Sequence, residues 1–178
     1  VAYVPQAYPG DFAYTVLDLV VMGRTAALGA FATPGRADLD IALRALDTLG
    51  IAALAERDST RISGGQRQLA LIARALAQQA GVVVMDEPTA SLDLGNRLRV
   101  LDRIRALAAD GLAVLVSTHE PEHAFAVADR VAVLGSGFET GPVDAVLTPD
   151  RLTRLYGVAL TVERTPTGRR VVSPVGQA

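Results

Sequence analysis

The chain has 178 residues, of which 50% are hydrophobic, and this suits a single domain with a substantial core. Its formal net charge of -2 gives no reason to expect a nucleic-acid-binding surface, and the absence of cysteine excludes disulfides and thiolate metal sites. No apolar run approaches the roughly 20 residues needed to span a bilayer, and no basic segment followed by an apolar one opens the sequence, so we expect a cytoplasmic protein.

Helices and strands are expected to alternate along most of the chain. Residues 1–4 have the character of the end of a strand, and the turn-rich residues 5–14 are expected to form a loop. Apolar residues then recur at helical spacing, or form short runs typical of buried strands. We expect helices over residues 15–23, 37–48, 63–79, 94–109 and 121–128, and strands over residues 82–85, 112–117 and 130–134. This alternation is typical of an α/β sandwich with a parallel core sheet.

The last quarter of the chain has weaker signals. We expect a hairpin edge at residues 138–140, two short helices over residues 142–147 and 149–155, and a small ribbon from residues 158–163 and 170–172. In the longer helices, the apolar spacing predicts these buried positions: Val16, Leu19, Val20 and Met22; Leu39, Ala42, Leu43 and Leu46; Leu69, Ile72, Ala73 and Leu76; Leu98, Leu101, Ile104 and Ala108.

The segment VVVMDEP, residues 82–88, places two acids directly after an apolar strand. In open parallel sheets, ligands bind beyond the carboxyl ends of the strands. The two acids are Asp86 and Glu87. One of them can bind Mg²⁺ through water, while the other deprotonates an attacking water. A solvated acidic loop at a strand end explains these residues equally well.

The segment RISGGQRQ, residues 61–68, places Ser63, Gly64, Gly65 and Gln66 at the start of a helix. Two glycines let the backbone approach a ligand, and the unpaired N–H groups of a helix N-terminus favour phosphate. The alternative is an ordinary capping box, since Ser followed by Gln three residues later has that spacing. Taken alone, the cap is the better explanation.

Three further polar residues occupy comparable positions. His119 follows the strand over residues 112–117, and Gln6 follows strand residues 1–4, so both are expected near the same sheet edge as Asp86. Asp93 directly precedes the helix expected over residues 94–109. The alternatives are a packing histidine, a loop glutamine and a helix cap.

The order of these motifs resembles that of the ATP-binding-cassette (ABC) ATPase family over residues 1–141. Gln6 matches the Q-loop glutamine, RISGGQRQ the signature motif, VVVMDEP the Walker B strand, SLD the D-loop and STH the switch histidine. The resemblance implies a P-loop NTPase-like α/β fold with a parallel-sheet core. It also implies a helical subdomain over about residues 7–80, a catalytic core over about residues 81–141, and C-terminal helices and a ribbon over residues 142–178.

The same resemblance implies a role for each residue that acts on the chain's own nucleotide. Asp86 would hold Mg²⁺ through water, and Glu87 would be the general base for the water that attacks the γ-phosphate of ATP. His119 would contact that phosphate. Gln6 would approach Mg²⁺ and the attacking water, and would sense the transport partner.

Other matched residues are implied to act across a dimer. Ser63, Gly64, Gly65 and Gln66 would bind the γ-phosphate of a nucleotide held by the opposite subunit, while Asp93 would communicate between the two sites. The implied partners are therefore a second ATPase subunit, membrane permease subunits and, indirectly, a substrate-binding protein, with the ATPase at the cytoplasmic face of the membrane.

Three segments resemble importers for iron-siderophore, haem and cobalamin. They are residues 14–29, which include VVMGR, and residues 45–58 and 148–158. The alternatives are a soluble ABC ATPase of DNA repair or translation, an importer of manganese or zinc, and a non-catalytic interaction fragment.

The chain departs from the family in one respect, because no Gly-rich loop ending in Lys-Ser or Lys-Thr occurs in it. In P-loop enzymes that Walker A loop grips the β- and γ-phosphates. We therefore expect a truncated member that lacks the N-terminal strands and the Walker A loop, and that binds ATP poorly and hydrolyses it negligibly on its own.

Overall fold

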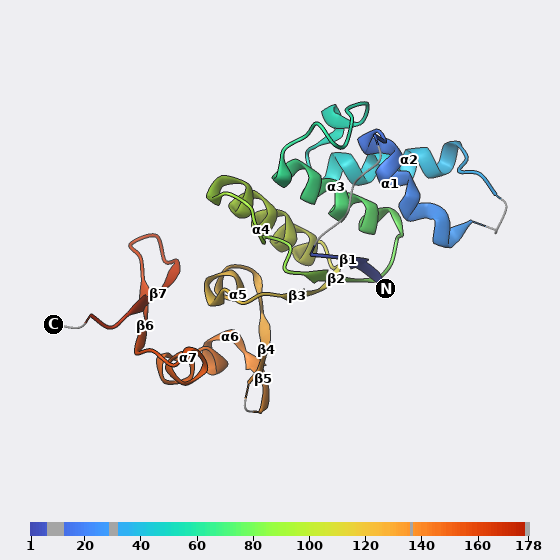
Figure 1. Cartoon of the computed structure of the whole chain (residues 1–178). Coiled ribbons are helices and arrows are strands. Elements are labelled where there is room, and N and C mark those ends of the chain that lie inside the picture. Colours follow the sequence, from blue (N-terminus) through green and yellow to red (C-terminus); the bar gives the residue numbers. More distant parts are fainter. Residues whose placement is uncertain (7–12, 29–31, 136, 177–178) are drawn as a thin grey trace. The chain divides into compact units, whose positions relative to one another are not determined.

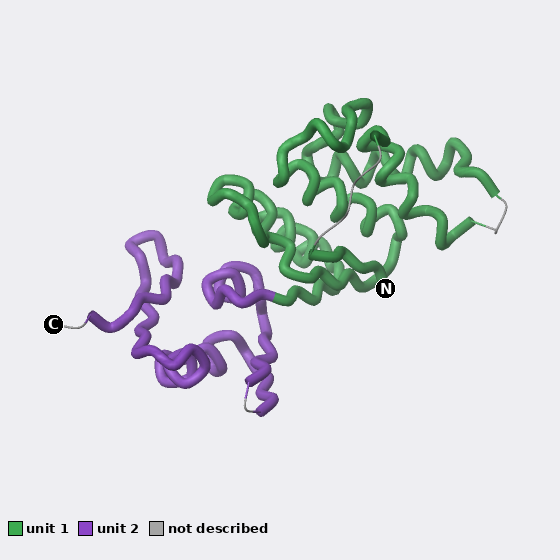
Figure 2. Tube along the Cα trace, in the orientation of Figure 1, with its two compact units in different colours: residues 1–117 green, residues 118–178 purple. Residues whose placement is uncertain are grey.

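The computed structural model describes residues 1–6, 13–28, 32–135 and 137–176, so most of the loop expected over residues 5–14 lies outside the described residues. Packing divides the chain into two compact units, residues 1–117 and 118–178 (Figure 2). This division differs from the domain boundary expected after residue 141. That boundary is inferred from the resemblance to complete ABC ATPases, and it remains a prediction. Among the described helices, none is both long and apolar enough to cross a bilayer.

A three-stranded parallel sheet forms the base of the first unit. Its order is β1 (Ala2–Val4), β2 (Val82–Asp86) and β3 (Ala113–Ser117), so β2 is central. The register pairs Val4 with Met85 and Asp86 with Ser117. The carboxyl ends of the three strands therefore meet at one edge, and the expected parallel α/β core is confirmed.

The two faces of this sheet differ in burial. Val83 and Met85 are buried beneath α3 (Gly64–Ala77) and α4 (Leu94–Ala109), which lie over one face (Figure 1). On the other face, Tyr3 is 55% exposed and Leu115 is 62% exposed. Because side chains alternate along a strand, Asp86 and Ser117 belong to this second face.

Three helices pack together above the sheet. They are α1 (Val16–Val21), α2 (Arg36–Thr48) and α3, each in contact with the other two. Short 3₁₀ helices, η1 (Met22–Ala27) and η2 (Ala52–Leu54), follow α1 and α2. Gly23 is required where η1 meets α3, because a Cβ there would lie 2.1 Å from the Arg74 carbonyl oxygen.

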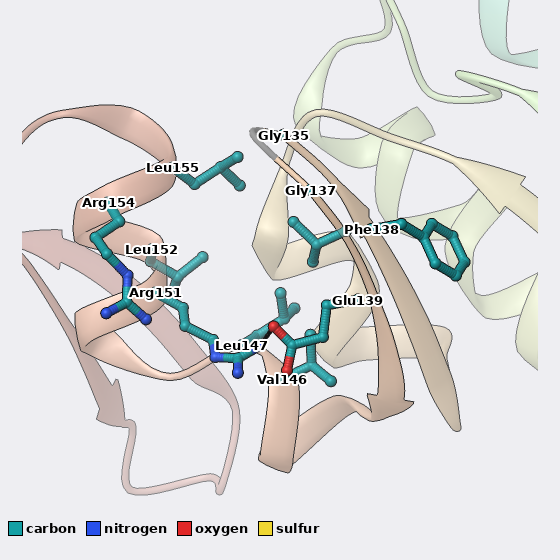
Figure 3. Close-up of a pocket in the computed structure, with 11 residues that line it drawn as sticks. Gly135, Gly137, Phe138, Glu139, Val146, Leu147, Arg151, Leu152, Arg154 and Leu155 are labelled. Carbon is teal, nitrogen blue, oxygen red and sulfur yellow. Dashed lines mark ion pairs between the residues drawn. The ribbon is translucent and has the colours of Figure 1, made fainter.

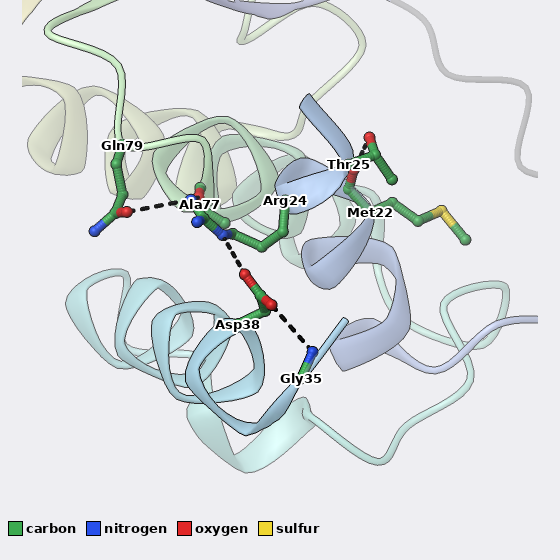
Figure 4. A network of polar contacts seen from close by, with 7 residues as sticks. All are labelled: Met22, Arg24, Thr25, Gly35, Asp38, Ala77 and Gln79. Atoms are coloured by element: carbon green, nitrogen blue, oxygen red, sulfur yellow. Dashed lines mark hydrogen bonds and ion pairs between the residues drawn. The ribbon is translucent and has the colours of Figure 1, made fainter. Parts of the chain in front are cut away.

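Arg24, from the VVMGR segment, joins η1 to α2 and α3 (Figure 4). Its Nε donates to Oδ1 of Asp38 at 2.9 Å, and one terminal nitrogen donates to the Ala77 carbonyl at 2.8 Å and to Oε1 of Gln79 at 3.2 Å. Oδ2 of Asp38 accepts from the Gly35 N–H, which caps α2. Arg24 is buried, so this segment has a structural role in the fold.

The predicted burial of these helices is partly wrong. Met22 and Leu76 are only half-buried, and larger differences occur in α2 and α4. In α2, Leu39 and Leu43 are 39% and 40% exposed, whereas Ala45 is buried. In α4, the buried stripe contains Val100 and Leu107 rather than Leu98 and Ala108. Helical spacing accommodates two neighbouring stripes, and the choice between them depends on which helix or strand packs opposite.

The second unit contains the expected hairpin, short helices and ribbon. Strand β4 (Arg130–Leu134) pairs antiparallel with β5 (Phe138–Pro142), and β6 (Leu160–Arg164) pairs with β7 (Arg170–Pro174). The helices are α5 (Pro121–Val127), α6 (Val143–Val146) and α7 (Pro149–Tyr156). They enclose a small core of Val146, Leu147 and Leu152, around which residues of α5 and of both strand pairs pack.

A pocket of about 370 Å³ opens between the β4–β5 hairpin and α7 within this unit (Figure 3). Glu139 and Arg151 form an ion pair at its rim. The remaining lining is mainly apolar, and it contains none of the residues singled out from the sequence motifs.

Candidate functional site

Asp86 ends β2 with both carboxylate oxygens in contact with hydroxyl groups. The Ser117 hydroxyl donates to Oδ1 at 2.5 Å, and the Tyr3 hydroxyl approaches Oδ2 at 3.4 Å. Burial and the negative charge of Asp86 both raise the pKa of Tyr3. Asp86 is therefore oriented from both neighbouring strands, because Ser117 ends β3 and Tyr3 lies in β1.

Glu87 has an unusual backbone conformation, with a φ of 41° in the left-handed region. For a residue other than glycine, such a conformation costs about 1–3 kcal/mol and persists only where the surroundings hold it. The Glu87 N–H donates to the Ser117 hydroxyl at 3.0 Å, and Nε2 of Gln6 donates to Oε2 of Glu87 at 3.0 Å. The structure thus brings Gln6, Asp86 and Glu87 together at one edge of the sheet.

Two residues of this cluster were not identified from the sequence. Ser117 belongs to the STH motif, but the motif gives a role only to His119; the structure shows that Ser117 ends the strand next to β2. Tyr3 carries no motif, and its place beside Asp86 depends on the strand register. A rule that inspects polar residues at the ends of neighbouring strands finds Ser117 but not Tyr3.

The SGGQ segment begins α3 with the capping box that the sequence left open as an alternative. Ser63 Oγ accepts from the Gln66 N–H at 3.3 Å, and Oε1 of Gln66 accepts from the Ser63 N–H at 3.0 Å. Ser63 and Gly64 are exposed, so the start of this helix is open to solvent. An accessible helix N-terminus retains the ability to attract a phosphate group.

The SLD segment lies against the SGGQ segment. Asp93 caps α4, with Oδ1 accepting from the Asn96 N–H at 2.9 Å and Oδ2 accepting from the Asn96 side-chain amide at 2.6 Å. These hydrogen bonds, first the one from the Asn96 backbone, lower the pKa of Asp93. A Cβ at Gly65 would lie 2.4 Å from the Asn96 side chain, and one at Gly64 would lie 3.7 Å from Leu92, so the SGGQ segment packs against both Leu92 of the SLD segment and the first turn of α4.

Of the predicted residues, only His119 belongs to the second unit. It is exposed, and its backbone carbonyl accepts a hydrogen bond from Tyr156 at 2.7 Å. The neighbouring His123 is buried and is linked to Glu120 and Thr118.

The acids at the end of β2 fit a metal ion that arrives with a nucleotide, and do not form a complete metal site. The described part of the chain has no group of three His, Cys, Asp or Glu residues that could hold a metal. Mg²⁺ is commonly bound by one or two carboxylates, several waters and substrate phosphates. The Asp86 carboxylate and the Gln6 amide oxygen suit that mode of binding.

The phosphate-gripping part of a P-loop is not encoded in these 178 residues. All 17 basic residues are arginine, so the sequence holds no lysine. In P-loop enzymes a lysine contacts the β- and γ-phosphates. The site described here therefore consists of acids, amides and helix N-termini without that lysine.

Comparison with known proteins gives a consistent family. Residues 1–90, half of the chain, match the family model described as ABC transporter. The chain is 41% identical over 158 residues to the molybdate import ATP-binding protein MolC of Haemophilus influenzae, which covers 88% of this chain and 62% of that protein. It is 41% identical over 179 residues to the hemin import ATP-binding protein HmuV of Nocardia farcinica, which covers 98% of this chain and 61% of that one.

A solved structure described as a metal-chelate type ABC transporter in an inward-facing conformation has the same fold. It matches with a TM-score of 0.92 and 36% identity, over 99% of this chain and 72% of the other. The chain spans about three fifths of the length of the two curated relatives, at 62% and 61%. On these matches and on its fold, the chain belongs to the ABC transporter family, among its ATP-binding proteins.

Proposed function

We propose that the chain supplies the water-activating acids and the signature segment of an ATPase that energises an ABC importer. The observation that carries the proposal is the cluster at the carboxyl end of β2, where Gln6 and Ser117 hold Glu87 beside Asp86. Adjacent acids with fixed orientations suit an in-line attack of water on a phosphoryl group, since positioning is the main catalytic resource in phosphoryl transfer.

In the proposed reaction, Glu87 accepts a proton from the water that attacks the γ-phosphate of ATP. Gln6 orients the Glu87 carboxylate, and its amide oxygen remains available to the same water. Asp86 would hold the ion that accompanies ATP, and His119 would contact the γ-phosphate. When bound, Mg²⁺ would neutralise the charge that develops on the phosphate oxygens.

The signature segment is proposed to serve a second nucleotide. The exposed N-terminus of α3, with Ser63 and Gly64 at its start, would receive the γ-phosphate of ATP held by another ATPase subunit. Asp93 touches the same region through Asn96, which supports its proposed role in communication between the two sites. The working unit would then be a dimer.

We also propose the cytoplasmic face of the membrane as the place of action, with permease subunits as partners and a substrate-binding protein as an indirect one. The proposed cargo is an iron-siderophore or a related metal chelate such as haem. The hemin import relative, the metal-chelate transporter and the VVMGR segment support this cargo. The molybdate import relative favours a second candidate, an oxyanion.

The first experiment measures how well the 178-residue chain binds and hydrolyses ATP on its own, without the rest of a complete cassette. We expect the 178-residue chain to bind ATP with Mg²⁺ far more weakly than micromolar affinity and to hydrolyse it negligibly, because it holds no P-loop lysine. Isothermal titration and a phosphate-release assay would measure both. Micromolar affinity of the 178-residue chain would contradict this part of the proposal.

The second experiment supplies the missing loop. The chain would be joined behind the Walker A-containing segment of a relative, and ATP hydrolysis would be measured with and without Glu87→Gln. We expect hydrolysis that the substitution abolishes while ATP binding is kept, whereas Glu56→Gln, at an exposed position, leaves the rate unchanged. Equal rates for the two variants would remove Glu87 as the base.

The cargo is tested separately. The joined protein would be reconstituted in vesicles with a candidate permease and binding protein from the same organism. Uptake of a ferric siderophore, haem and molybdate would then be compared. Uptake of molybdate alone would replace the metal-chelate proposal with the oxyanion one.

A further inference from the structure

The end of α7 contacts the loop that carries His119. Tyr156 is the last residue of this helix, and its hydroxyl donates to the backbone carbonyl of His119 at 2.7 Å. Gly157 follows with a φ of 72° and ends the helix there. The hydrogen bond therefore joins residues 37 positions apart in the chain, within one compact unit.

Other contacts of this loop come from the start of α5. Thr118 Oγ1 accepts from the Glu120 N–H at 3.1 Å and lies 3.2 Å from Nδ1 of His123. His123 is 5% exposed and also lies 3.2 Å from a Glu120 carboxylate oxygen. These contacts hold the residues on either side of His119, whereas Tyr156 holds the His119 backbone itself.

Tyr156 is well anchored for such a role. Leu152, one turn earlier in α7, is 1% exposed in the core of the unit, and the Thr153 hydroxyl accepts from the Leu160 N–H at 2.9 Å. Burial, and then the nearby charge of Glu120, raise the pKa of Tyr156, so its hydroxyl keeps its proton at neutral pH. Tyr156, itself 42% exposed, thus donates from an anchored helix to the carbonyl of an exposed histidine.

We propose that Tyr156 is a positioning residue for His119. It fixes the His119 backbone and so limits the directions in which the imidazole points, without touching a nucleotide itself. The proposal rests on the function proposed above only in the role given to His119. It gives helix α7 a part in placing His119, which lies in the same unit.

The test uses the 178-residue chain and its two histidines, whose ring signals are separable by NMR. Tyr156→Phe removes only the hydroxyl and keeps the ring. We expect it to shift the His119 ring signals and to speed hydrogen exchange of the Glu120 N–H roughly five-fold, the effect of losing one ordinary hydrogen bond. The matched control is Tyr14→Phe, which removes a hydroxyl from the first unit and should change neither signal.

The β4–β5 hairpin shows whether the substitution acts locally. Its amide hydrogen exchange should stay unchanged in Tyr156→Phe. Unaltered His119 signals, or the same changes in both variants, would overturn the proposal. A second measurement needs no variant: nuclear Overhauser contacts between the Tyr156 ring and His119 are expected in the unaltered chain. Their absence would also overturn it.

The consequence for catalysis is measured in the joined protein. Tyr156→Phe should lower kcat about five-fold without changing KM for ATP, since His119 is misdirected while nucleotide binding is kept. An unchanged kcat overturns the positioning role. If His119→Ala itself leaves hydrolysis unchanged while the Tyr156 contact is present, the proposed function of His119 fails and the structural contact stands.

Discussion

Nε2 of Gln6 donates to Oε2 of Glu87 at 3.0 Å, across a separation of 81 residues in the chain. The contact exists because Gln6 closely follows β1 and Glu87 follows the neighbouring parallel strand β2, so both leave the sheet at the same edge. It ties the segment after β1 to the acid proposed to activate water. A change in the position of Gln6 would therefore alter the hydrogen bonding of Glu87.

Ser117→Ala is expected to impair hydrolysis more than Ser117→Thr in the joined protein. The Ser117 hydroxyl donates to Asp86 and accepts from the Glu87 N–H, and it supports the positive φ of Glu87. Loss of a hydrogen bond to a charged group costs about 1.5–3 kcal/mol, which predicts a roughly ten- to hundred-fold loss of rate. Steady-state kinetics checks this, and equal rates for the Ala and Thr variants would refute it.

Gly65→Ala is expected to destabilise the 178-residue chain, whereas Gly64→Ala is its matched control. A Cβ at Gly65 would lie 2.4 Å from the Asn96 side chain, while one at Gly64 would lie 3.7 Å from its nearest neighbour, Leu92. Because Asn96 is held by Asp93, it yields only by losing that hydrogen bond. Urea unfolding should show about 1–3 kcal/mol of lost stability for Gly65→Ala, the usual cost of overpacking, and less for Gly64→Ala.

Arg24→Leu is expected to lower the stability of the helical layer. The substitution leaves Asp38 without its cation and removes a donor from the Ala77 carbonyl. Removing one partner of this ion pair leaves the other charge uncompensated, so the free energy of unfolding should fall. Arg36→Leu, at an exposed position that begins α2, should cost much less in the same unfolding measurement.

Acid should weaken the same layer through Asp38. The hydrogen bond from Arg24 holds the pKa of Asp38 below its usual value, followed by that from the Gly35 N–H. A lowered carboxylate pKa adds stability that is fully present above the unfolded value of about 3.9 and is lost as pH falls through the folded value. Unfolding free energies measured from pH 6 down to acid should therefore fall below about pH 4.

Asp38→Asn supplies the comparison for that pH series. Its amide has no charge to lose, so the slope of stability against pH should be shallower than in the unaltered chain. Asp58 and Asp93 also have lowered pKa values and would keep part of the slope. Parallel curves for the two proteins would show that Asp38 does not contribute to the acid response.

Several elements were predictable from the sequence because they carry strong local signals. The helix over residues 94–109 is found with both of its expected ends, since Asp93 caps it and the apolar spacing persists along it. Ser63 and Gln66 likewise form the capping box that their spacing indicates. Local chemistry decides such features, and a single sequence contains it.

Features that depend on partners across the fold were not predictable. Ser117 and Tyr3 reach Asp86 only through the register of three strands, and Arg24 reaches Asp38 only because η1 packs beside α2 and α3. The exposed Leu43 shows the same limit, because its helix has two possible apolar stripes and tertiary contacts select one. The sequence shows that Ser117 is a polar residue at a strand end, but the contacts of Ser117, Tyr3 and Arg24 depend on long-range neighbours.

The register of β2 also links core packing to the position of Asp86 at the end of the strand. Val83 and Met85 are buried on one face, while Asp86 belongs to the other. A slip of one residue against β1 and β3 would turn the apolar pair outward and carry the carboxylate into the core, which the energy of burial forbids. A single-residue insertion within β2 should therefore abolish folding, whereas the same insertion at the exposed Gly81, before the strand begins, should be tolerated.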